Sequence, residues 1–472
     1  MQGVSTGAWV RGLLAATLVC LGGCNTLPTI HPDLVRSRAP VQVDGARGPL
    51  TAAQSQLVIA KLKAGGKDTS IFDRHLAFEE AVVGSPLVAG NKVALLIDGP
   101  NTYRSMFSAI GEARDHINLE TYILEDDEVG AEFARVLIDK QKSGVQVNMI
   151  HDGVGTLSTP KEYFKRLTDA GIRVLEFNPV NPLKAKAGWD VNQRDHRKLL
   201  IVDGRTAILG GINISSVYSG GSFSTGSSAS RGRRSGKDAG PDDLPWRDTD
   251  IRIDGPVVAE FQKLFLSTWA SQKGPELPSR SYFPTIEAQG KEVVRAIGSS
   301  PDEPFSLMYA TLISAIDAAE TDILITNAYF VPDPQLVKSL KTAVTRGVDV
   351  KLLLPSKTDS WLVFHAGRAS YRDLLEAGIK IYERQDALLH SKTALIDGVW
   401  STIGSTNLDW RSFLHNQEVN AVVLGGDFGQ QMRALFQRDI EASRPIALED
   451  WKKRGIGPRV KEAVGKMWEY WL

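Results

Sequence analysis

Cysteine is nearly absent from this sequence of 472 residues, since its two cysteines, Cys20 and Cys24, both lie near the N-terminus. The remainder of the chain therefore forms no disulfide. An excess of either charge is absent too, because 55 Lys and Arg balance 55 Asp and Glu. A chain without net charge has no general attraction for polyanions, which argues against nucleic acid as a partner. Histidine is scarce at eight residues, so positions where it recurs in a fixed pattern are informative.

The apolar run near the N-terminus is short. It covers residues 12–23 after Arg11, which is too little to span a bilayer and fits the apolar region of a signal peptide. Its end, L-G-G-C, resembles a bacterial lipoprotein signal and implies that Cys24 is lipidated and tethers the chain to a membrane, facing the periplasm. By the habit of that family, Asn25 favours the outer membrane over the inner one. An ordinary cleaved signal and an uncleaved anchor are the alternatives.

The most informative stretch is 194–215, R-D-H-R-K-L-L-I-V-D-G-R-T-A-I-L-G-G-I-N-I-S. Two apolar runs flank Asp203 and Gly204, which predicts a β-hairpin with a turn at these residues. If the turn has only two residues, Lys198 faces Leu209 and His196 faces Gly211. The residues expected to converge on one face are then His196, Lys198, Gly211 and Asn213. Asp203, the acid of the motif, is expected to be a hydrogen-bonder in the turn, and Gly211 to let a ligand approach the backbone.

The same frame returns at 389–407, L-H-S-K-T-A-L-I-D-G-V-W-S-T-I-G-S-T-N. The residues at matching spacings are His390, Lys392, Asp397, Ser405 and Asn407. Ser405 replaces Gly211 and is expected to face His390 and to add a hydroxyl donor. A surface hairpin with incidental His and Lys would explain one copy, but two matched copies argue for a functional site.

Strands and helices alternate along the rest of the chain, which predicts an α/β fold. The order is repeated: I-N-L-E-T-Y-I at 117 matches I-L-I-T-N-A-Y-F at 323, and A-G-I-R-V at 170 matches A-G-I-K-I at 377. We therefore expect two lobes, 84–285 and 286–445, with half of the site in each. Ala170 precedes His196 by 26 residues, whereas Ala377 precedes His390 by 13. The first lobe thus has extra residues, which we expect to form a loop at the mouth of a cleft.

The remaining segments are assigned by composition. We expect a signal peptide at 1–24, a tether with N-terminal helices at 25–83, a Ser/Gly-rich loop at 215–245 and a basic, aromatic tail at 446–472. A solvated linker is favoured for the loop over contact with lipid headgroups. The tail suits either a membrane interface or a helix packed on the second lobe.

The duplicated H-x-K-x4-D-x6-G-[GS]-x-N pattern resembles the signature of the phospholipase D superfamily. Within it, R-D-H-R-K-L-L-I-V-D-G-R, Y-F-V-P-D and N-L-D-W-R-S are most similar to bacterial cardiolipin synthases. The resemblance covers residues 84–445. It implies two tandem lobes, each a mixed β-sheet flanked by helices, packed as a pseudo-dimer around one shared active-site cleft. Because both half-sites lie in one chain, a monomer suffices for a complete site.

This resemblance indicates phosphodiester chemistry. An anionic phosphodiester needs donors around its oxygens, and the expected donors are Lys198, Lys392, Asn213, Asn407 and Ser405. One histidine attacks phosphorus to form a phosphohistidine, and the other protonates the leaving alkoxide. In the superfamily the N-terminal histidine is more often the nucleophile, which favours His196. An ammonium beside each histidine repels a cation, so we expect neither a metal ion nor another cofactor.

Each imidazole needs a partner on its second nitrogen to hold its tautomer. By resemblance, Glu418 is assigned to His390, and Asp250 occupies the matching place for His196. Glu120 and Tyr329, at the ends of matching strands, either line the cleft or are simply buried.

Three functions compete on this evidence. A phosphatidyltransferase would pass a phosphatidyl group to a lipid alcohol and make cardiolipin from phosphatidylglycerol or phosphatidylethanolamine. A phospholipase D would use water instead, and a non-catalytic lipid-binding protein would have lost its motifs. Intact motifs disfavour the third function. The segments expected to wall the cleft against water are 178–190, with Leu183, Ala185 and Trp189, and the aromatic turn 361–364. We therefore expect transfer.

Overall fold

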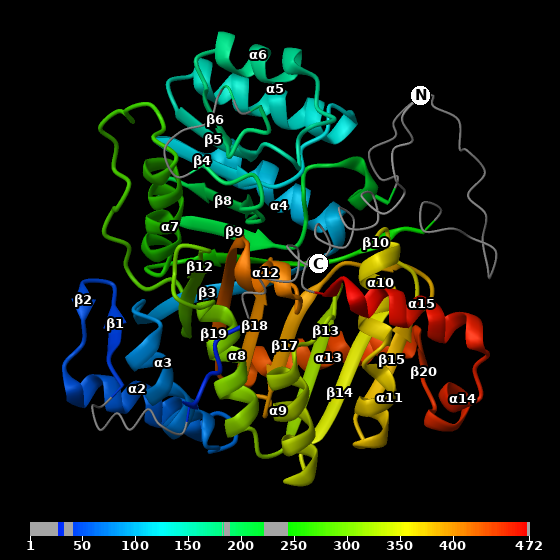
Figure 1. Ribbon diagram of the computed structural model, residues 1–472. Helices are drawn as coiled ribbons and strands as arrows, with labels where there is room; N and C mark the ends of the chain where they lie inside the picture. Colours follow the sequence, from blue (N-terminus) through cyan, green and yellow to red (C-terminus); the bar gives the residue numbers. More distant parts are fainter. Residues whose placement is uncertain (1–26, 33–40, 182, 184–188, 221–243, 470–472) are drawn as a thin grey trace, which may run out of the picture.

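The computed structural model describes residues 27–32, 41–181, 183, 189–220 and 244–469. The chain forms two α/β lobes, one above the other in Figure 1, and each contains a mixed β-sheet flanked by helices. The predicted fold class is therefore confirmed. The first lobe orders its strands β6-β5-β4-β8-β9-β11-β3, and the second repeats this order as β15-β14-β13-β17-β18-β19-β12.

The strands of the first lobe are β3 (Leu87–Ile97), β4 (His116–Thr121), β5 (Gln146–Asp152), β6 (Arg173–Phe177), β8 (Leu199–Val202), β9 (Thr206–Gly210) and β11 (Thr249–Asp254). Those of the second are β12 (Glu292–Ser299), β13 (Asp322–Asn327), β14 (Asp349–Pro355), β15 (Lys380–Arg384), β17 (Lys392–Ile396), β18 (Trp400–Gly404) and β19 (Asn416–Leu424). Strands β3 and β12 pair antiparallel, so the two sheets are continuous across the boundary between the lobes.

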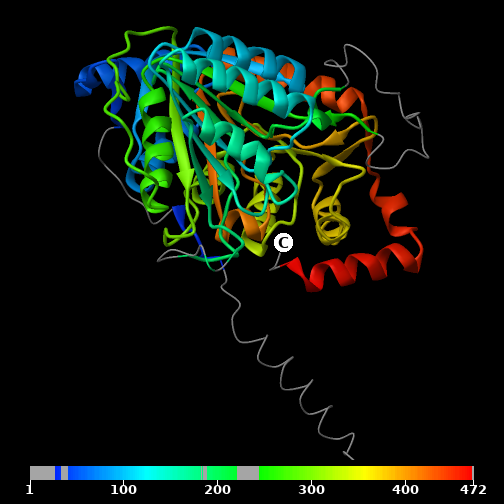
Figure 2. The ribbon, with the colours of Figure 1, turned by 90° about the horizontal axis from the view of Figure 1, so that it is seen from above.

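The helices lie on the faces of these sheets (Figures 1 and 2). The first lobe has α4 (Asp98–Glu112), α5 (Glu128–Lys142), α6 (Lys161–Asp169) and α7 (Val258–Ser271), and the second has α8 (Leu307–Ala318), α9 (Pro334–Thr345), α10 (Trp361–Arg368), α11 (Tyr371–Glu376), α12 (Trp410–Leu414) and α13 (Gly426–Glu441). Asp127 and Asp333 cap α5 and α9 by accepting from backbone N–H groups in the first turn. One apolar core crosses the lobe boundary and joins Ile251, Phe265 and Val294.

Further elements flank the lobes at both ends of the chain. They are β1 (Val43–Gly45), β2 (Gly48–Pro49), α2 (Ala52–Ala64) and α3 (Leu76–Val82) before the first lobe, and β20 (Ser443–Pro445), α14 (Leu448–Lys452) and α15 (Ile456–Met467) after the second. Helices α2 and α3 lie within 25–83, where N-terminal helices were predicted. Helix α15 packs on α10 of the second lobe, which was one of the two alternatives for the tail.

Several predictions fall outside the described residues: Cys20, Cys24, Ala185 and residues 221–243 of the Ser/Gly-rich segment. Lipidation of Cys24 and the location in the envelope stay predictions. Within the part of the chain that the structure describes, no helix has both the length and the apolar character needed to cross a bilayer.

The two motif hairpins form, but with a different register from the predicted one. Val202 pairs with Thr206 and Leu199 with Leu209, so Leu199 rather than Lys198 faces Leu209. Asp203 and Gly204 both have positive φ, as in a type I′ turn, but Arg205 is left outside the ladder as a third loop residue. The predicted two-residue turn is therefore wrong by one residue. The second hairpin repeats this geometry, with Ile396 paired to Trp400.

Candidate active site

Each motif histidine is held by the opposite lobe. Short strand β7 (Arg194–Asp195) pairs in parallel with the start of β19, and β10 (Trp246–Arg247) pairs in parallel with β16 (Leu388–Leu389). The backbone N–H of His196 donates to the Gln417 carbonyl at 3.0 Å, and that of His390 donates to the Arg247 carbonyl at 2.8 Å. The two half-sites are thus assembled at the lobe boundary, as the pseudo-dimer arrangement requires.

The carboxylate partners of the histidines also come from the opposite lobe. His196 Nδ1 lies 3.1 Å from both carboxylate oxygens of Glu418, and His390 Nδ1 lies 2.7 Å from Asp248 Oδ2. The prediction that Glu418 serves His390 and that Asp250 serves His196 is therefore wrong on both counts. With Nδ1 occupied by a carboxylate, Nε2 is the nitrogen of each imidazole that can face a phosphoryl group.

Asp248 in the first lobe is equivalent to Glu418 in the second, because each follows a residue that pairs with the strand just before a motif histidine. Gln417 is opposite Asp195 just before His196, and Arg247 is opposite Leu389 just before His390. The residue after each of them, Glu418 or Asp248, then reaches the facing histidine.

Asp250 lies two positions further along the strand. Its Oδ1 accepts from the Ile212 N–H at 3.1 Å, and burial together with the charge of Asp248 raises its pKa well above the usual range. Alternate residues of a strand point to the same face, so Asp248 and Asp250 lie on one face. The sequence pattern therefore could not show which of the two contacts a histidine.

The electrostatics of the cluster favour neutral imidazoles beside ionised carboxylates. Burial lowers the pKa of His196 to about 4, and the charge of Lys198 acts in the same direction. Burial and Lys392 likewise lower the pKa of His390. Burial opposes ionisation of Glu418, but its contact with His196 and the charge of Lys198 outweigh that effect and lower its pKa. Asp248 behaves in the same way beside His390.

The two motif lysines are buried among these groups. Lys198 Nζ donates to the His196 carbonyl at 2.6 Å, and Lys392 Nζ donates to the His390 carbonyl. Burial lowers the pKa of Lys198 to about 7 and also lowers that of Lys392. The charge of Lys392 acts on both Lys198 and His196, so groups from both motifs form one electrostatic cluster.

A tyrosine stands beside each histidine. The Tyr122 ring is centred 5.0 Å from that of His196 and 5.1 Å from Lys198 Nζ, and the Tyr329 ring is 6.3 Å from that of His390. The alternative that Tyr329 lines the cleft is supported, whereas Glu120 is fully buried 3.7 Å from the Arg197 guanidinium. Tyr122 was not singled out from the sequence, and in the repeated strand motif it lies one position before the place that Tyr329 occupies in the second copy.

The small and amide residues of the motifs do not all have the predicted roles. A Cβ at Gly211 would come within 2.4 Å of the Asp248 carboxylate, so this glycine makes room for the acid rather than for a ligand. Ser405, at the equivalent position, donates to Glu418 Oε2 at 2.5 Å and not toward His390. Asn213 Nδ2 donates to the Tyr218 hydroxyl at 3.0 Å. Asn407 is buried, and its Oδ1 has no protein hydrogen-bond partner.

The motif aspartates act on the backbone, as the sequence predicts. Asp203 accepts from the N–H groups of Arg114, Asp115 and His116. Asp397 accepts from those of Glu320, Thr321 and Asp322, just before and at the first residue of β13. Each aspartate therefore anchors the turn of its hairpin to the start of a neighbouring strand.

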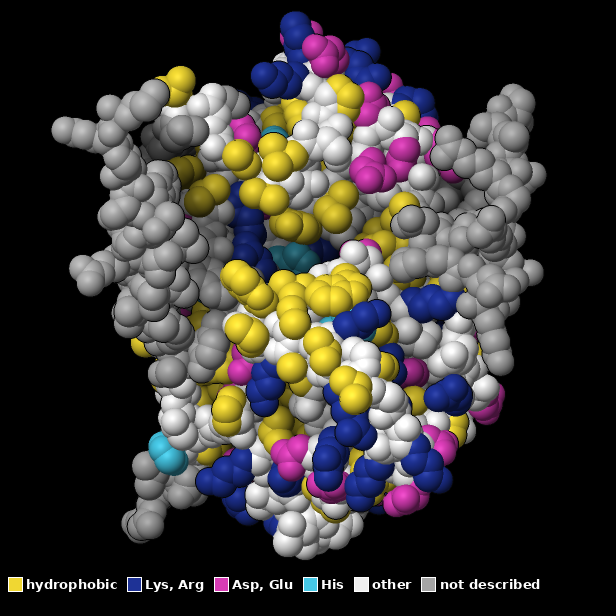
Figure 3. Space-filling view, turned by 45° about the vertical axis from the view of Figure 1, so that its right-hand side comes forward, with side chains coloured by type: hydrophobic (Ala, Val, Ile, Leu, Met, Phe, Trp, Pro, Cys, Tyr) yellow, Lys and Arg dark blue, Asp and Glu magenta, His cyan; other side chains and the backbone are white. Residues whose placement is uncertain are grey.

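Figure 3 shows a hollow between the lobes in which histidine and Lys or Arg side chains are visible, bordered by hydrophobic side chains on both lobes. Of the expected walls, Trp361 and Leu183 are exposed, and Trp189 donates through Nε1 to the Pro179 carbonyl at 2.8 Å. Among the described residues, no group of three or more His, Cys, Asp or Glu is placed to hold a metal ion. Catalysis without a metal stays a prediction.

Comparison with known proteins bears on this geometry. The family model described as "Cardiolipin synthase, PLD-like domain" matches residues 106–219 and 312–440. The chain is 34% identical to a cardiolipin synthase of Geobacillus sp. (strain WCH70), across 81% of this chain and 73% of the relative. It is also 34% identical to cardiolipin synthase A of Pseudomonas putida (strain W619), across 80% and 75%. A solved phosphatidylserine synthase from Haemophilus influenzae Rd KW20 shares the fold, with a TM-score of 0.59 and 13% identity over 83% of this chain and 96% of that one.

Proposed function

Because the chain belongs to the cardiolipin synthase family with phospholipase D-like domains, we propose that it transfers a phosphatidyl group to the hydroxyl of phosphatidylglycerol through a phosphohistidine. The observation that carries this proposal is the pair of histidines, each with a carboxylate from the opposite lobe on Nδ1. Such a pair supplies a nucleophile and a proton donor for one phosphodiester.

In the first step, Nε2 of His196 attacks phosphorus while the bond from phosphorus to the headgroup oxygen breaks. His390 gives its proton to the leaving alkoxide. Burial and Lys392 lower the pKa of His390, and the negative charge of the bound phosphodiester opposes that effect when the proton is needed. Lys198 and Lys392 stabilise the charge that develops on the phosphoryl oxygens.

In the second step, His390 accepts the proton of the acceptor hydroxyl, whose oxygen attacks phosphorus as the nitrogen–phosphorus bond breaks. With phosphatidylglycerol as both donor and acceptor, the products are cardiolipin and glycerol. Water as the acceptor would give phosphatidic acid. The curated relatives named cardiolipin synthase and the hydrophobic border of the hollow support transfer over hydrolysis.

The product distribution tests this proposal. We expect the purified protein, in vesicles that contain phosphatidylglycerol and phosphatidylethanolamine, to make cardiolipin with release of glycerol or ethanolamine. Phosphatidic acid is expected only as a side product, and mass spectrometry of the lipids measures the ratio. A His196→Ala protein is the control for background conversion. Phosphatidic acid as the sole product at every lipid density would assign the protein to the phospholipases.

The pH dependence of kcat/KM should report Lys198 when the substrate is a p-nitrophenyl phosphodiester, because departure of that leaving group needs no proton from His390. An ammonium is charged below its pKa, so the charge of Lys198 is present below pH 7 and is lost above it. We expect kcat/KM to fall by about tenfold per pH unit above this midpoint. In Lys198→Arg the guanidinium stays charged, so the fall with its midpoint near pH 7 should disappear even if the absolute rate is lower. Exposed Lys291→Arg is the control. An unchanged midpoint in Lys198→Arg would contradict the assignment.

A further inference from the structure

Helix α15 presents an apolar face to solvent. Of the thirteen exposed large hydrophobic side chains in the described part of the chain, five lie on this helix and its C-cap: Ile456, Val460, Val464, Met467 and Trp468. Ile456 and Met467 are 78% and 79% exposed. The spacings of three and four residues place these side chains on one stripe. A contiguous exposed apolar stripe marks an interaction surface rather than an ordinary solvated face.

The opposite face of α15 is fixed to the second lobe. A Cβ at Gly465 would come within 2.5 Å of the backbone of Ala366, so α15 and α10 approach closely there. Glu462 is buried on the same side and forms an ion pair with Arg454, 3.1 Å apart at the longer of two contacts. The contacts of Gly465 and Glu462 therefore fix the rotation of α15 about its axis, and this rotation directs the apolar stripe toward solvent. Figure 2 shows α15 along the outer edge of the molecule, with α10 between it and the sheet.

Cations flank the stripe. Arg459 and Lys466 lie along one side of it and Lys461 along the other, at about 100° of rotation per residue, and all three are exposed. The only acid of α15 is the buried Glu462. The exposed part of this helix is thus positive, although the whole chain is neutral. An apolar stripe between two basic edges is the arrangement of a helix that lies in the interface of an anionic bilayer.

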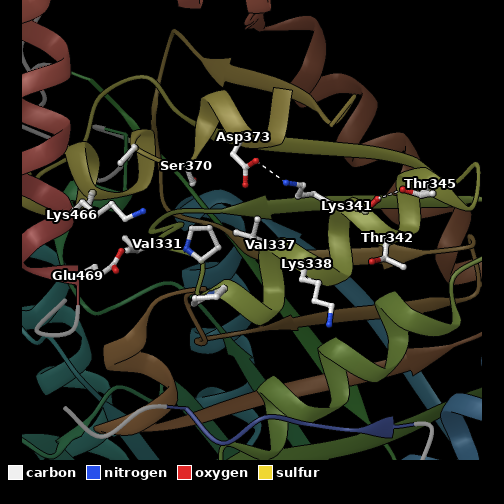
Figure 4. Close-up of a pocket in the computed structure, with 14 residues that line it drawn as sticks. Val331, Val337, Lys338, Lys341, Thr342, Thr345, Ser370, Asp373, Lys466 and Glu469 are labelled. Carbon is white, nitrogen blue, oxygen red and sulfur yellow. Dashed lines mark hydrogen bonds and ion pairs between the residues drawn. The ribbon is translucent and has the colours of Figure 1, made fainter. Parts of the chain in front are cut away.

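A groove of about 550 Å³ opens beside this helix, between α9, α10 and the end of α15 (Figure 4). Lys338 and Lys466 lie on its rim, and Val331 and Val337 contribute apolar wall. The neighbouring Lys341 is paired with Asp373 at 2.7 Å. Glu469 lines the same groove and interacts with the charge of Lys466, so the ammonium of Lys338 above the apolar wall is the part that matches the phosphate and glycerol region of a phospholipid.

The start of the described chain lies at the same face. Leu27 packs against a cluster that contains Val331, Val363 and Ala366, and so contacts both the groove and α10. Leu27 is the third residue after Cys24, and three steps along the chain reach at most about 10 Å. A lipid anchor at Cys24 would therefore enter the membrane beside α15.

We propose that the outward face of α15 docks on the surface of an anionic phospholipid bilayer. Docking would also orient the cleft. Helix α10 begins at Trp361, two residues after Asp359, which accepts from the hydroxyl of Tyr329 at 2.5 Å beside His390. That this orientation helps lipid transfer rests on the proposed function. The docking of α15 on a bilayer does not depend on it.

Nitroxide accessibility tests the docking. The full chain carrying Val460→Cys in a Cys20→Ser, Cys24→Ser background is spin-labelled and mixed with vesicles of phosphatidylglycerol and phosphatidylcholine. We expect position 460 to become accessible to oxygen and protected from a water-soluble nickel chelate. Both changes should be smaller with vesicles of phosphatidylcholine alone. Leu57→Cys on α2, where the side chain is 62% exposed, is the matched control and should stay accessible to the chelate.

Three outcomes would overturn the proposal. Protein that does not float with anionic vesicles, or that floats while position 460 stays accessible to the chelate, would show that the face does not dock. Spin–spin broadening at position 460 without vesicles would instead assign the face to a second copy of the chain. All three readouts are independent of catalysis, so a failed transfer reaction does not affect them.

A charge on the stripe supplies a second test. Val460→Glu should lower the rate of headgroup release from phosphatidylglycerol vesicles by at least about tenfold. The rate on short-chain phosphatidylglycerol dissolved as monomers should be unchanged, as should both rates for Leu57→Glu. Headgroup release reports transfer and hydrolysis alike, so this result holds whichever acceptor the enzyme uses. Equal rates of Val460→Glu and wild type on vesicles would contradict docking.

Discussion

His196→Ala is expected to lower kcat by a factor of about 10⁴ or more, and His390→Ala to do the same with natural lipids. Removing His196 removes the atom that bonds to phosphorus, and removing His390 leaves the alkoxide to depart without a proton. A substrate with a good leaving group separates these roles. With a p-nitrophenyl phosphodiester the leaving group needs no proton, so His390→Ala should release about one equivalent of p-nitrophenol in a burst and then stall. His196→Ala should show no burst.

The controls for this experiment are an unchanged circular dichroism spectrum and Tm for each variant, and full activity of exposed His31→Ala. A burst in His196→Ala and none in His390→Ala would reverse the assignment of nucleophile and acid. Turnover near the wild-type rate in either variant would rule out the two-histidine mechanism.

The repeat and its two half-sites were predictable because their signal is local. The alternation of apolar strands and helices, the H-x-K spacing and the Asp-Gly turns each depend on neighbours a few residues away. Asp203 and Asp397 show this well: an aspartate in a turn is a backbone acceptor wherever the hairpin lies. The one-residue error in register arose at Arg205, since the choice between a two-residue and a three-residue loop depends on which residues pair beyond the turn.

The acids were not predictable in the same way because their partners lie across the lobe boundary. Glu418 is 222 residues from His196, and Asp248 is 142 residues from His390. Only the parallel pairings of β7 with β19 and of β10 with β16 bring them together. A comparison of the halves correctly indicates an acid near the start of β11, but it does not show which of two aspartates on one strand face reaches an imidazole. The packing of the lobes also explains why the Ser405 hydroxyl donates to Glu418 rather than facing His390.

Asp248→Asn and Asp250→Asn separate the two aspartates by experiment. Asp248 Oδ2 holds the Nδ1 proton of His390 at 2.7 Å, and so fixes the tautomer that places Nε2 toward phosphorus. An asparagine can offer its N–H₂ group to Nδ1 instead, which stabilises the wrong tautomer. We expect Asp248→Asn to lower kcat by about 10³ to 10⁴. Loss of the carboxylate should also lower the pKa of His390 further, because the charge of Asp248 acts to raise it. Imidazole resonances in NMR titrations measure this shift.

Asp250→Asn is the matched substitution two positions along the same strand. Burial and the charge of Asp248 raise the pKa of Asp250, which favours the protonated carboxyl, and an asparagine amide is close to that form in shape and charge. The amide oxygen can still accept from the Ile212 N–H. We therefore expect a change of only a few-fold in kcat and no shift in the pKa of His390. Two results together would contradict this assignment: a loss of activity in Asp250→Asn as severe as in Asp248→Asn, and an unchanged His390 pKa in both variants. The aspartates would then act through the packing of β11, and the contact between Asp248 and His390 would not be what orients the imidazole.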